Sequence, residues 1–333
     1  HAVPGHSQGS VTNRNGDKKM NYLKDYREGE KFVGTYLCKQ KQILKTKAGK
    51  TYYSLTLQDK TGTADGKIWE LNNGIANFEP MDYIHCEGMV TSFQGNLQMN
   101  ISRVRISDEG EYDPADYVPC TNKDVGEMFS RILKYVASVQ NKYLRKILEM
   151  YFVENKEFVD AFKKHSAAKS VHHGFMGGLL EHTLSVTDMC QYFAEHYPML
   201  HRDLLITAAL FHDMGKIQEI SDFPMNDYTD DGQLLGHIYI GARCMENAAA
   251  QIPNFPPKLK NELVHCILAH HGKMEFGSPK VPAIMEAMAL HMADNADAKL
   301  QTLTEVFTQA GDNMGWLGFN RMFESNLRKT SEE

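Results

Sequence analysis

The sequence predicts a chain of two domains, a small all-β barrel followed by an all-α domain. At 333 residues, the chain is long enough for about two domains. Turn-separated runs rich in Val, Ile, Thr, Tyr and Phe occupy residues 31–107, which predicts strands. Beyond about residue 125, apolar residues recur at helical spacing instead. With 42% hydrophobic and 23% charged residues, the composition is that of a soluble globular protein.

Five strands are expected in the first half, over residues 31–42, 51–58, 62–69, 82–93 and 96–106. Turn signals separate them, and residues 71–78 are expected to form a short helix between the third and fourth strands. Five strands with a helix in this position are the order of an OB-fold, a small barrel that often binds oligonucleotides. A barrel used only for docking would have the same order, so the order alone leaves both interpretations open.

Basic residues gather in the expected barrel although the chain as a whole is acidic. The net charge is −6, but residues 31–69 hold eight lysines against Asp59 and Asp65, a local charge of about +6. Proteins that bind single strands need cations along the phosphates and flat rings on which bases stack. The barrel is therefore expected to bind single-stranded RNA or DNA. The expected contact residues are Lys39, Lys41, Lys45, Lys47, Tyr53 and Trp69.

Changes in composition set the expected domain boundaries. Residues 1–19 resemble a disordered expression tag, residues 20–110 the barrel, residues 111–155 a linker with connecting helices, and residues 156–325 the helical domain. No apolar run reaches the roughly 18 residues of a membrane span, so no membrane partner is expected. Six scattered cysteines without a CxxC pair favour reduced thiols in a cytoplasmic protein.

Histidines and aspartates mark the ends and faces of the helices expected in the second half. His182 lies on a helix with an apolar stripe. His212 and Asp213 end a nearly all-apolar helix over residues 204–211, with Gly215 as its expected stop. Such a helix must be buried, so the polar pair at its end needs partners.

Three further helices carry the rest of the set. His237 is expected to open a helix after a turn at residues 230–232, and His270-His271 to close one that begins at residues 256–257. Asp294 lies on a helix entered near residue 282, with His291 and Asp297 one turn to either side. One histidine on an apolar helix is more often a hydrogen-bonded core residue than a ligand. The whole ordered set favours metal binding, because ionised carboxylates in apolar surroundings need a cation or several donors.

This ordered set resembles the HD-domain superfamily of metal-dependent phosphohydrolases. The local sequence is more similar still to YhaM-type 3′-to-5′ exoribonucleases, which pair an N-terminal OB-fold with a C-terminal HD domain. The resemblance rests on residues 172–173, 177–183, 211–216, 236–237, 270–279 and 291–299. It implies a metal-dependent exoribonuclease that degrades single-stranded RNA to nucleoside 5′-monophosphates, with single-stranded DNA as a further substrate.

The resemblance also implies which residues hold metal. One ion would be held by His182, His212, Asp213 and Asp294, and Asp213 would bridge to a second ion held by His237, His270 and His271. Many HD domains hold a single ion, and the last three histidines would then bind phosphate. Imidazole and carboxylate ligands without thiolate favour Mn²⁺, Fe²⁺, Co²⁺ or Ni²⁺ over structural zinc. The resemblance implies Mn²⁺.

Two cations about 4 Å apart can activate a water and clamp the attacking and leaving oxygens of an in-line displacement. Asp213 and Lys216 are the expected catalytic residues, with Lys216 neutralising charge on the phosphoryl oxygens. An ordinary lysine at a helix C-terminus is the alternative interpretation of Lys216.

Four more residues have expected supporting roles. His172 and His173 are expected to contact substrate or to protonate the leaving oxygen, with capping of the backbone before Gly174 as the alternative. His291 and Asp297 are expected to orient the metal ligands rather than to bind the ion.

Two other functions stay open: an HD enzyme of small nucleotides, and a non-catalytic regulatory protein that binds single strands. The cyclic-dinucleotide branch normally shows Gly-Tyr-Pro after its paired histidines, whereas this chain has Phe276-Gly277-Ser278-Pro279. A mononucleotide would also leave the lysine-rich barrel without a use. A non-catalytic protein is expected to have lost some metal ligands, and none is lost. A homo-oligomer is compatible with the sequence, since residues 128–139 form an amphipathic stripe.

Overall fold

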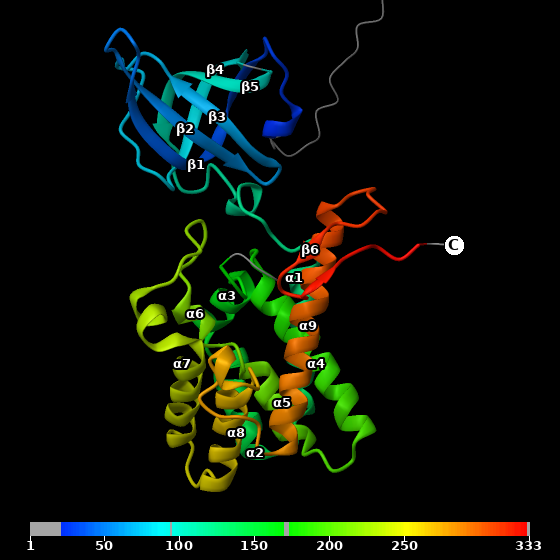
Figure 1. The fold of residues 1–333 in the computed structure, drawn as a ribbon. Helices are drawn as coiled ribbons and strands as arrows, with labels where there is room; N and C mark the ends of the chain where they lie inside the picture. The colour runs from blue at the N-terminus through cyan, green and yellow to red at the C-terminus, as the bar shows by residue number, and fades with distance from the viewer. Residues whose placement is uncertain (1–20, 94, 170–172, 332–333) are drawn as a thin grey trace, which may run out of the picture. The chain divides into compact units, whose positions relative to one another are not determined.

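The computed structural model describes residues 21–93, 95–169 and 173–331. Contacts within the chain divide it into two compact units, with the division between Tyr117 and Val118 (Figure 1). The expected tag at residues 1–19 and the candidate residue His172 lie outside the described residues. Among the helices of the described residues, none is both long and apolar enough to span a membrane.

The first unit contains a closed five-stranded barrel. Its strands are β1 Lys31–Lys45, β2 Thr51–Asp59, β3 Gly62–Ile68, β4 Tyr83–Phe93 and β5 Asn96–Ile106. Hydrogen bonds follow the order β1-β2-β3-β5-β4, and the pairing of β4 with β1 closes the barrel. β3 and β5 run parallel, whereas the other neighbouring strands run antiparallel. The predicted OB-fold barrel is therefore confirmed, and each strand lies within a few residues of its expected position.

The interior of the barrel follows from the alternation of side chains along the strands. On β2, Leu55 and Leu57 are buried while Thr56, which lies between them, is partly exposed. These leucines pack with Phe32, Tyr36 and Ile84 in a core that belongs to the barrel alone. The barrel thus has a complete hydrophobic core of its own.

The short helix expected over residues 71–78 is absent, and this prediction was wrong. The side chain of Asn72 accepts a hydrogen bond from the backbone of Gly74 at 2.8 Å, which forms a turn. The amide of Ala76 then donates to the carbonyl of Val104 at 2.9 Å, and the amide of Val104 donates to Gly74 at 2.9 Å. Pairing with β5 satisfies the backbone groups that a helix would have satisfied internally, and such long-range pairing leaves no local signal.

The second unit is helical, as predicted. Its helices are α1 Val125–Ser138, α2 Lys142–Glu149, α3 Lys156–Lys164, α4 Gly178–His196, α5 Arg202–Phe211, α6 Lys216–Glu219, α7 Asp230–Ala250, α8 Pro257–Ala269 and α9 Met285–Gln309. A short hairpin follows α9, and its two strands, β6 Phe319–Asn320 and β7 Ser325–Asn326, have two residues each. The second unit also has a 3-10 turn, η4 Met274–Phe276, and a π-helical turn, η3 Met150–Glu154. Two further 3-10 turns, η1 Leu23–Asp25 and η2 Pro114–Asp116, belong to the first unit.

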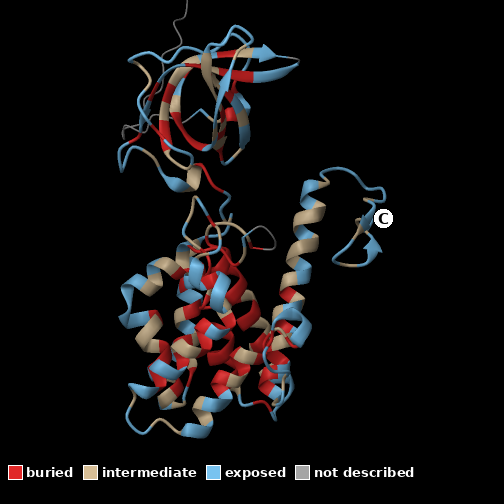
Figure 2. Ribbon diagram, turned by 60° about the vertical axis from the view of Figure 1, so that its left-hand side comes forward, coloured by how far each residue is buried: buried red, intermediate tan, exposed pale blue. Residues whose placement is uncertain are grey.

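Helix α5 occupies the middle of the helical unit. All residues from Leu204 to Phe211 are buried, and α5 contacts α2, α4, α8 and α9. In Figure 2 the buried residues accordingly gather in the middle of the helices of this unit. A helix that is apolar on every face must be surrounded in this way. Its end therefore delivers His212 and Asp213 into the interior of the protein.

Two glycines have roles that differ from those expected. Gly215 does not stop α5 in a left-handed conformation; its φ is −64°, and a Cβ atom there would lie 2.1 Å from the carbonyl oxygen of His237. Residues 230–232, expected to form a turn before the helix, are already helical and begin α7. The side chain of Thr229 accepts from the amide of Gly232 at 2.9 Å and caps this helix. The chain bends at Gly236 instead, where φ is +73°, directly before His237.

Candidate metal centre

Helices α4, α5 and α9 bring the first group of predicted ligands together. Nε2 of His182 lies 3.2 Å from Nε2 of His212, 3.3 Å from Oδ2 of Asp213 and 3.1 Å from Oδ1 of Asp294. Ligand atoms that are each about 2.1 Å from one ion lie about 3.0–3.4 Å from one another. His182, His212 and Asp213 are therefore close enough to share a cation, and Asp294 lies beside them with Oδ1 3.9 Å from Nε2 of His212. We call these four side chains the first cluster.

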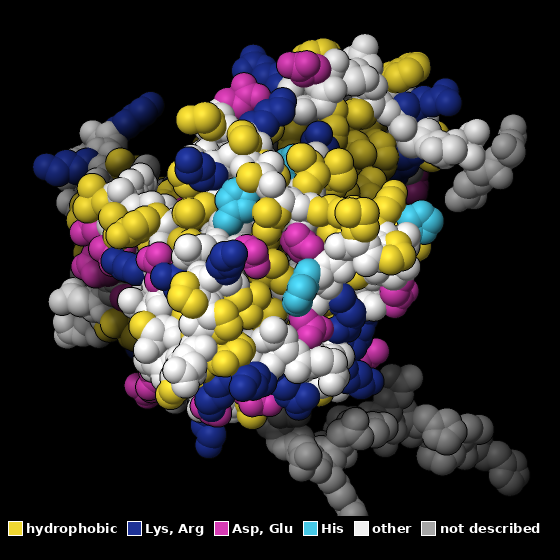
Figure 3. All heavy atoms as spheres, turned by 90° about the horizontal axis from the view of Figure 1, so that it is seen from below, with side chains coloured by type: hydrophobic (Ala, Val, Ile, Leu, Met, Phe, Trp, Pro, Cys, Tyr) yellow, Lys and Arg dark blue, Asp and Glu magenta, His cyan; other side chains and the backbone are white. Residues whose placement is uncertain are grey.

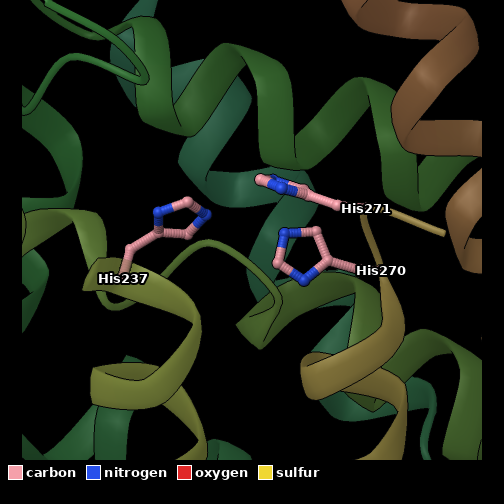
Figure 4. Close-up of side chains that lie close together, drawn as sticks. All are labelled: His237, His270 and His271. Carbon is pink, nitrogen blue, oxygen red and sulfur yellow. The ribbon is translucent and has the colours of Figure 1, made fainter. Parts of the chain in front are cut away.

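A second cluster, formed by His237, His270 and His271, lies beside the first. The ring nitrogens that these residues offer lie within 4.8 Å of one another, and the three rings turn toward one another in Figure 4. Oδ1 of Asp213 lies 3.5 Å from Nε2 of His237 and 3.6 Å from Nε2 of His270. The two oxygens of Asp213 thus face different clusters, Oδ2 the first and Oδ1 the second.

All five histidines of the two clusters hold Nδ1 against an oxygen that accepts and cannot donate. The contacts are His182 to Asp297 at 2.6 Å, His212 to the carbonyl of Ala209 at 2.7 Å, His237 to Glu219 at 2.9 Å, His270 to the carbonyl of Ile267 at 2.6 Å and His271 to the carbonyl of Phe276 at 2.8 Å. Each Nδ1 therefore carries a proton and donates it to its partner. In the neutral ring this leaves a lone pair on Nε2, the atom that a metal ion binds.

Several atoms at the centre lack a partner that could satisfy them. Among the described residues, Oδ1 of Asp213 and Nε2 of His237 and His270 are buried and form no hydrogen bond. All three atoms present lone pairs, so they cannot satisfy one another, and leaving them buried without a partner is costly. A divalent cation satisfies such a set at once. The residues present therefore fit metal ions bound by nitrogen and oxygen ligands.

Pairing overcomes the cost of burying charge in the first cluster. Burial opposes the charged form of His182, but its hydrogen bonds with Asp213, Asp294 and Asp297 raise its pKa well above the ordinary value. Burial likewise opposes ionisation of Asp213, but the Lys216 ammonium lowers the pKa of that carboxyl well below its usual range. The carboxylates therefore stay ionised at neutral pH, as ligands of a cation must be.

Two imidazoles of the second cluster have lowered pKa values. Burial lowers the pKa of His270, and burial together with the neighbouring His270 lowers the pKa of His271 to about 4. Burial opposes ionisation of Glu219, but its hydrogen bonds with His237 lower the pKa of that carboxyl. Both His270 and His271 are thus uncharged at neutral pH, which is the form that binds a metal.

Lys216, predicted to neutralise phosphoryl charge, lies at the first cluster. Its Nζ is 2.8 Å from Oδ2 of Asp213, and its side chain is largely buried in the first turn of α6. Burial opposes the ammonium, but Asp213 raises the pKa of Lys216 above its ordinary value. A fixed positive charge therefore lies beside the carboxylate that the two clusters share.

Asp297 and His291 contact ligand residues without entering either cluster. One oxygen of Asp297 accepts from Nδ1 of His182 at 2.6 Å, and the other accepts from the hydroxyl of Ser185. His291 donates from Nδ1 to the carbonyl oxygen of His270 at 2.9 Å. Both contacts suit the orienting role expected from the sequence.

The structure places His173 behind the first cluster, with its ring centre 5.3 Å from that of His182. Its Nε2 lies 2.9 Å from Oδ2 of Asp297, and Asp297 binds the Nδ1 side of His182, opposite the side that faces the cluster. The ring of His173 is also buried. The expected contact with substrate does not fit this position, in which His173 supports Asp297 instead.

Sequence reasoning missed Glu219, at the end of α6. Its Oε1 accepts from Nδ1 of His237 at 2.9 Å and from the amide of the same residue at 3.0 Å. That amide is available because the bend at Gly236 interrupts α7. Several acidic residues lie between Lys216 and His237, and nothing local distinguishes Glu219 from the others.

Two of the barrel residues expected to contact nucleic acid are engaged with the barrel itself. Nζ of Lys41 donates to the carbonyl of Phe78 at 2.7 Å and lies 4.7 Å from the ring centre of Tyr53. The ring of Tyr53 also packs edge-on against Phe78. Lys41 and Tyr53 therefore close one side of the barrel, and contact with a ligand would require breaking these interactions.

The other barrel candidates are accessible. Lys39, Lys45 and Lys47 are exposed along β1 and the turn that follows it. Trp69 stacks on Tyr52 with ring centres 4.6 Å apart and is 40% exposed. On the face of the molecule seen in Figure 3, by contrast, basic and acidic side chains are interspersed with hydrophobic ones. The accessible lysines and the paired rings have the chemistry of a surface that binds single strands.

Comparison with known proteins agrees with this arrangement. Residues 179–299 match the HD domain family. The chain is 33% identical over 257 residues to the 3′-5′ exoribonuclease YhaM of Geobacillus sp. (strain WCH70), covering 77% of this chain and 78% of that protein. It is 32% identical over 262 residues to the YhaM of Bacillus subtilis (strain 168), covering 77% and 81%. It is 32% identical over 293 residues to the YhaM of Listeria innocua serovar 6a, covering 85% and 90%. The chain belongs to the YhaM family, and its helical unit contains an HD domain.

Proposed function

We propose that this protein is a metal-dependent 3′-5′ exoribonuclease that hydrolyses single-stranded RNA to nucleoside 5′-monophosphates. One observation carries the proposal: five histidines donate from Nδ1 to acceptors, so that their Nε2 atoms and the oxygens of Asp213 and Asp294 converge. Such a site suits the hydrolysis of phosphodiesters. The name of the related proteins supports RNA as substrate and the 3′ end as the starting point.

Each residue of the centre has a part in this reaction. The metal ligands that we propose are His182, His212, Asp213 and Asp294 for one ion, and Asp213, His237, His270 and His271 for a second. Bound ions supply Lewis acidity, which activates water and stabilises charge on the phosphoryl group. Asp213 fixes the separation of the two clusters through its two oxygens. Lys216 holds a positive charge where the non-bridging phosphate oxygens gain negative charge.

The barrel would bind the part of the strand that is not being cleaved. Lys39, Lys45 and Lys47 can pair with phosphates, and the Tyr52–Trp69 pair offers a flat surface to a base. Single-stranded DNA is an alternative ligand of the same chemistry. Manganese as the ion, a cytoplasmic location and a homo-oligomer stay predictions.

Time-resolved digestion of end-labelled RNA tests this function. The protein with Mn²⁺ is expected to shorten 5′-labelled single-stranded RNA from the 3′ end and to release nucleoside 5′-monophosphates, whereas duplex RNA resists. Replacement of His212 and Asp213 by alanine together should abolish the activity, and His196→Ala, which changes an exposed histidine on α4, should preserve it. Hydrolysis of free nucleotides in place of RNA would favour the small-nucleotide enzyme instead.

A further inference from the structure

The segment that follows His270-His271 exposes two large apolar side chains. Phe276 is 57% exposed and Met274 is 72% exposed. Both lie in the single 3-10 turn η4, which the assigned roles of the metal ligands leave unexplained. An exposed aromatic ring, on a residue whose backbone is hydrogen-bonded to a proposed metal ligand, has the shape and chemistry to contact a substrate.

Hydrogen bonds fix the backbone that carries the Phe276 ring. The amide of Phe276 donates to the carbonyl of Lys273 at 3.1 Å, and the amide of Gly277 donates to Met274 at 3.0 Å. Gly277 then turns the chain with φ of +90°. The carbonyl of Phe276 accepts the Nδ1 proton of His271 at 2.8 Å. The backbone that carries the ring is therefore tied to a proposed metal ligand, so this backbone loses little conformational entropy when a ligand stacks on the ring.

A positive charge accompanies the ring. Nζ of Lys273 lies 5.4 Å from the ring centre of Phe276, and it also pairs with Glu275 at 3.3 Å. Both members of this ion pair are exposed, so the ammonium can exchange Glu275 for an incoming anion at small cost. A flat ring next to an ammonium matches the two parts of a nucleotide, its base and its phosphate.

We propose that Phe276 is the platform on which the base of the 3′-terminal nucleotide stacks, and that Lys273 pairs with a phosphate of the same strand. The proposal rests on the proposed nuclease function and adds the residues that hold the end of the strand. A base is separated from its own phosphate by a single ribose. The backbone of Phe276 is likewise close to the proposed metal ligand His271, to which it is hydrogen-bonded. Stacking accepts every base, because each has a π-face, so the platform suits an enzyme that removes one nucleotide after another.

Fluorescence of 2-aminopurine at the 3′ terminus of a single-stranded RNA tests the platform directly. Stacking quenches this base, so binding to the unaltered protein is expected to quench it, and Phe276→Tyr should retain the quenching. Phe276→Leu keeps the apolar volume but removes the π-face and should lose it. Met274→Ala is the matched control, because it changes an exposed apolar side chain of the same turn, and it should leave the quenching intact.

Kinetics provide the second readout. For Phe276→Leu, the KM for RNA is expected to rise about tenfold, the change that ~1.4 kcal/mol of lost stacking produces, with kcat little changed. An RNA whose terminal nucleotide lacks its base should show the same loss with the unaltered protein and no further loss with the variant. If Phe276→Leu raised the KM equally for the intact RNA and for the RNA that lacks its terminal base, the proposal would be overturned. Quenching that survives Phe276→Leu but disappears in Trp69→Ala would also overturn it, because the barrel would then hold the terminal base.

The two proposals fail in different ways. Quenching by the unaltered protein without shortening of the RNA would refute the exoribonuclease and leave the platform standing. Shortening of the RNA that Phe276→Leu does not affect would refute the platform and leave the exoribonuclease standing. Unchanged Mn²⁺ binding by Phe276→Leu, measured by calorimetry, shows that the variant keeps its centre; this is expected because His271 contacts the backbone of Phe276 and not its ring.

Discussion

Asp297 accepts hydrogen bonds from three donors at once, and one of these bonds orients the ring of His182. It accepts from His182, from His173 and from the hydroxyl of Ser185. The carboxylate also favours the tautomer of His182 that leaves a lone pair on Nε2. The burial of His173 behind Asp297 extends this support one residue further from the cluster.

Asp297→Asn should weaken Mn²⁺ binding about 10- to 100-fold, the usual loss when a residue that orients a metal ligand is changed. The amide removes the negative charge and competes as a donor with Nδ1 of His182. Isothermal titration calorimetry measures the change. Asp312→Asn, an exposed aspartate beyond α9, should bind Mn²⁺ as the unaltered protein does. Equal affinities for the Asp297 variant and its control would contradict the orienting role.

Glu219→Gln should act on the second cluster alone. Its carboxylate binds both the amide and Nδ1 of His237, and it makes no contact of this kind with the first cluster. We expect about two Mn²⁺ per unaltered chain, the number that a two-metal hydrolase holds, and a fall toward one in the variant. Metal analysis after equilibrium dialysis gives the count. A single ion in both proteins would show that the second cluster binds phosphate instead.

At the scale of residues, the sequence identifies the histidines and aspartates that converge, because their order and spacing along the chain resemble those of HD domains. His182 and Asp294 could be named this way although they lie on different helices. Glu219 could not, because its importance depends on a bend at Gly236 that brings the amide of His237 to it. The burial of His173 likewise follows from packing rather than from any local pattern.

Among the elements, the close approach of α6 and α7 depends on glycine. At Gly215 a Cβ atom would lie 2.1 Å from the carbonyl oxygen of His237, whereas at Gly241 the nearest atom would be 3.5 Å away. The atom that a Cβ would clash with at Gly215 belongs to the backbone and cannot move aside, whereas every neighbour of a Cβ at Gly241 would lie at an ordinary contact distance. The position of His237 therefore depends on the absence of a side chain one helix away.

Gly215→Ala should destabilise the helical unit by about 1–3 kcal/mol, the usual cost of overpacking, and should reduce Mn²⁺ binding at the second cluster. Gly241→Ala is the control within the same packed region, and it should be neutral or stabilising by up to about 1 kcal/mol because alanine favours a helix over glycine. Urea unfolding followed by circular dichroism compares the two. Similar stability for both variants would show that α7 can shift without cost.

The elements differ in how far they could be predicted. The five strands and α5 have strong internal periodicity or uniform apolarity, which local sequence displays. Residues 71–78 have neither, and their pairing with Val104 decides their conformation. Gly215 was expected to end α5 because glycines commonly do so, but the approach of α7 determines its use here.

For the molecule as a whole, two separate hydrophobic cores imply two separable unfolding events. The proposed metal ligands all lie in the helical unit: three lie within α4, α7 and α9, and the other four directly follow the ends of α5 and α8. Binding of an ion to the folded state alone stabilises it by mass action. Metal should therefore stabilise one unit and leave the other unchanged.

Removal of metal by a chelator should lower the Tm of the helical unit and leave that of the barrel unchanged in scanning calorimetry. Mn²⁺ at 100 times its Kd is expected to stabilise the helical unit by about 2.7 kcal/mol. His212→Ala should remove most of this dependence, because it deletes a ligand of the first cluster. A shift of the barrel transition of the same size would mean that the two units do not unfold independently.

The sharing of Asp213 between the clusters also constrains the electrostatics of catalysis. Imidazoles, which bind a metal in their uncharged form, provide five of the seven proposed ligands, so Asp213 and Asp294 are the two ligands that oppose the charge of the ions, and Lys216 adds to that charge. With both clusters filled, the centre is cationic until an anionic phosphodiester enters. Substrate and ions consequently reinforce one another's affinity, by thermodynamic reciprocity. The protein is therefore expected to bind its ions more tightly while RNA is bound, and to lose them more readily to a chelator when no RNA is bound.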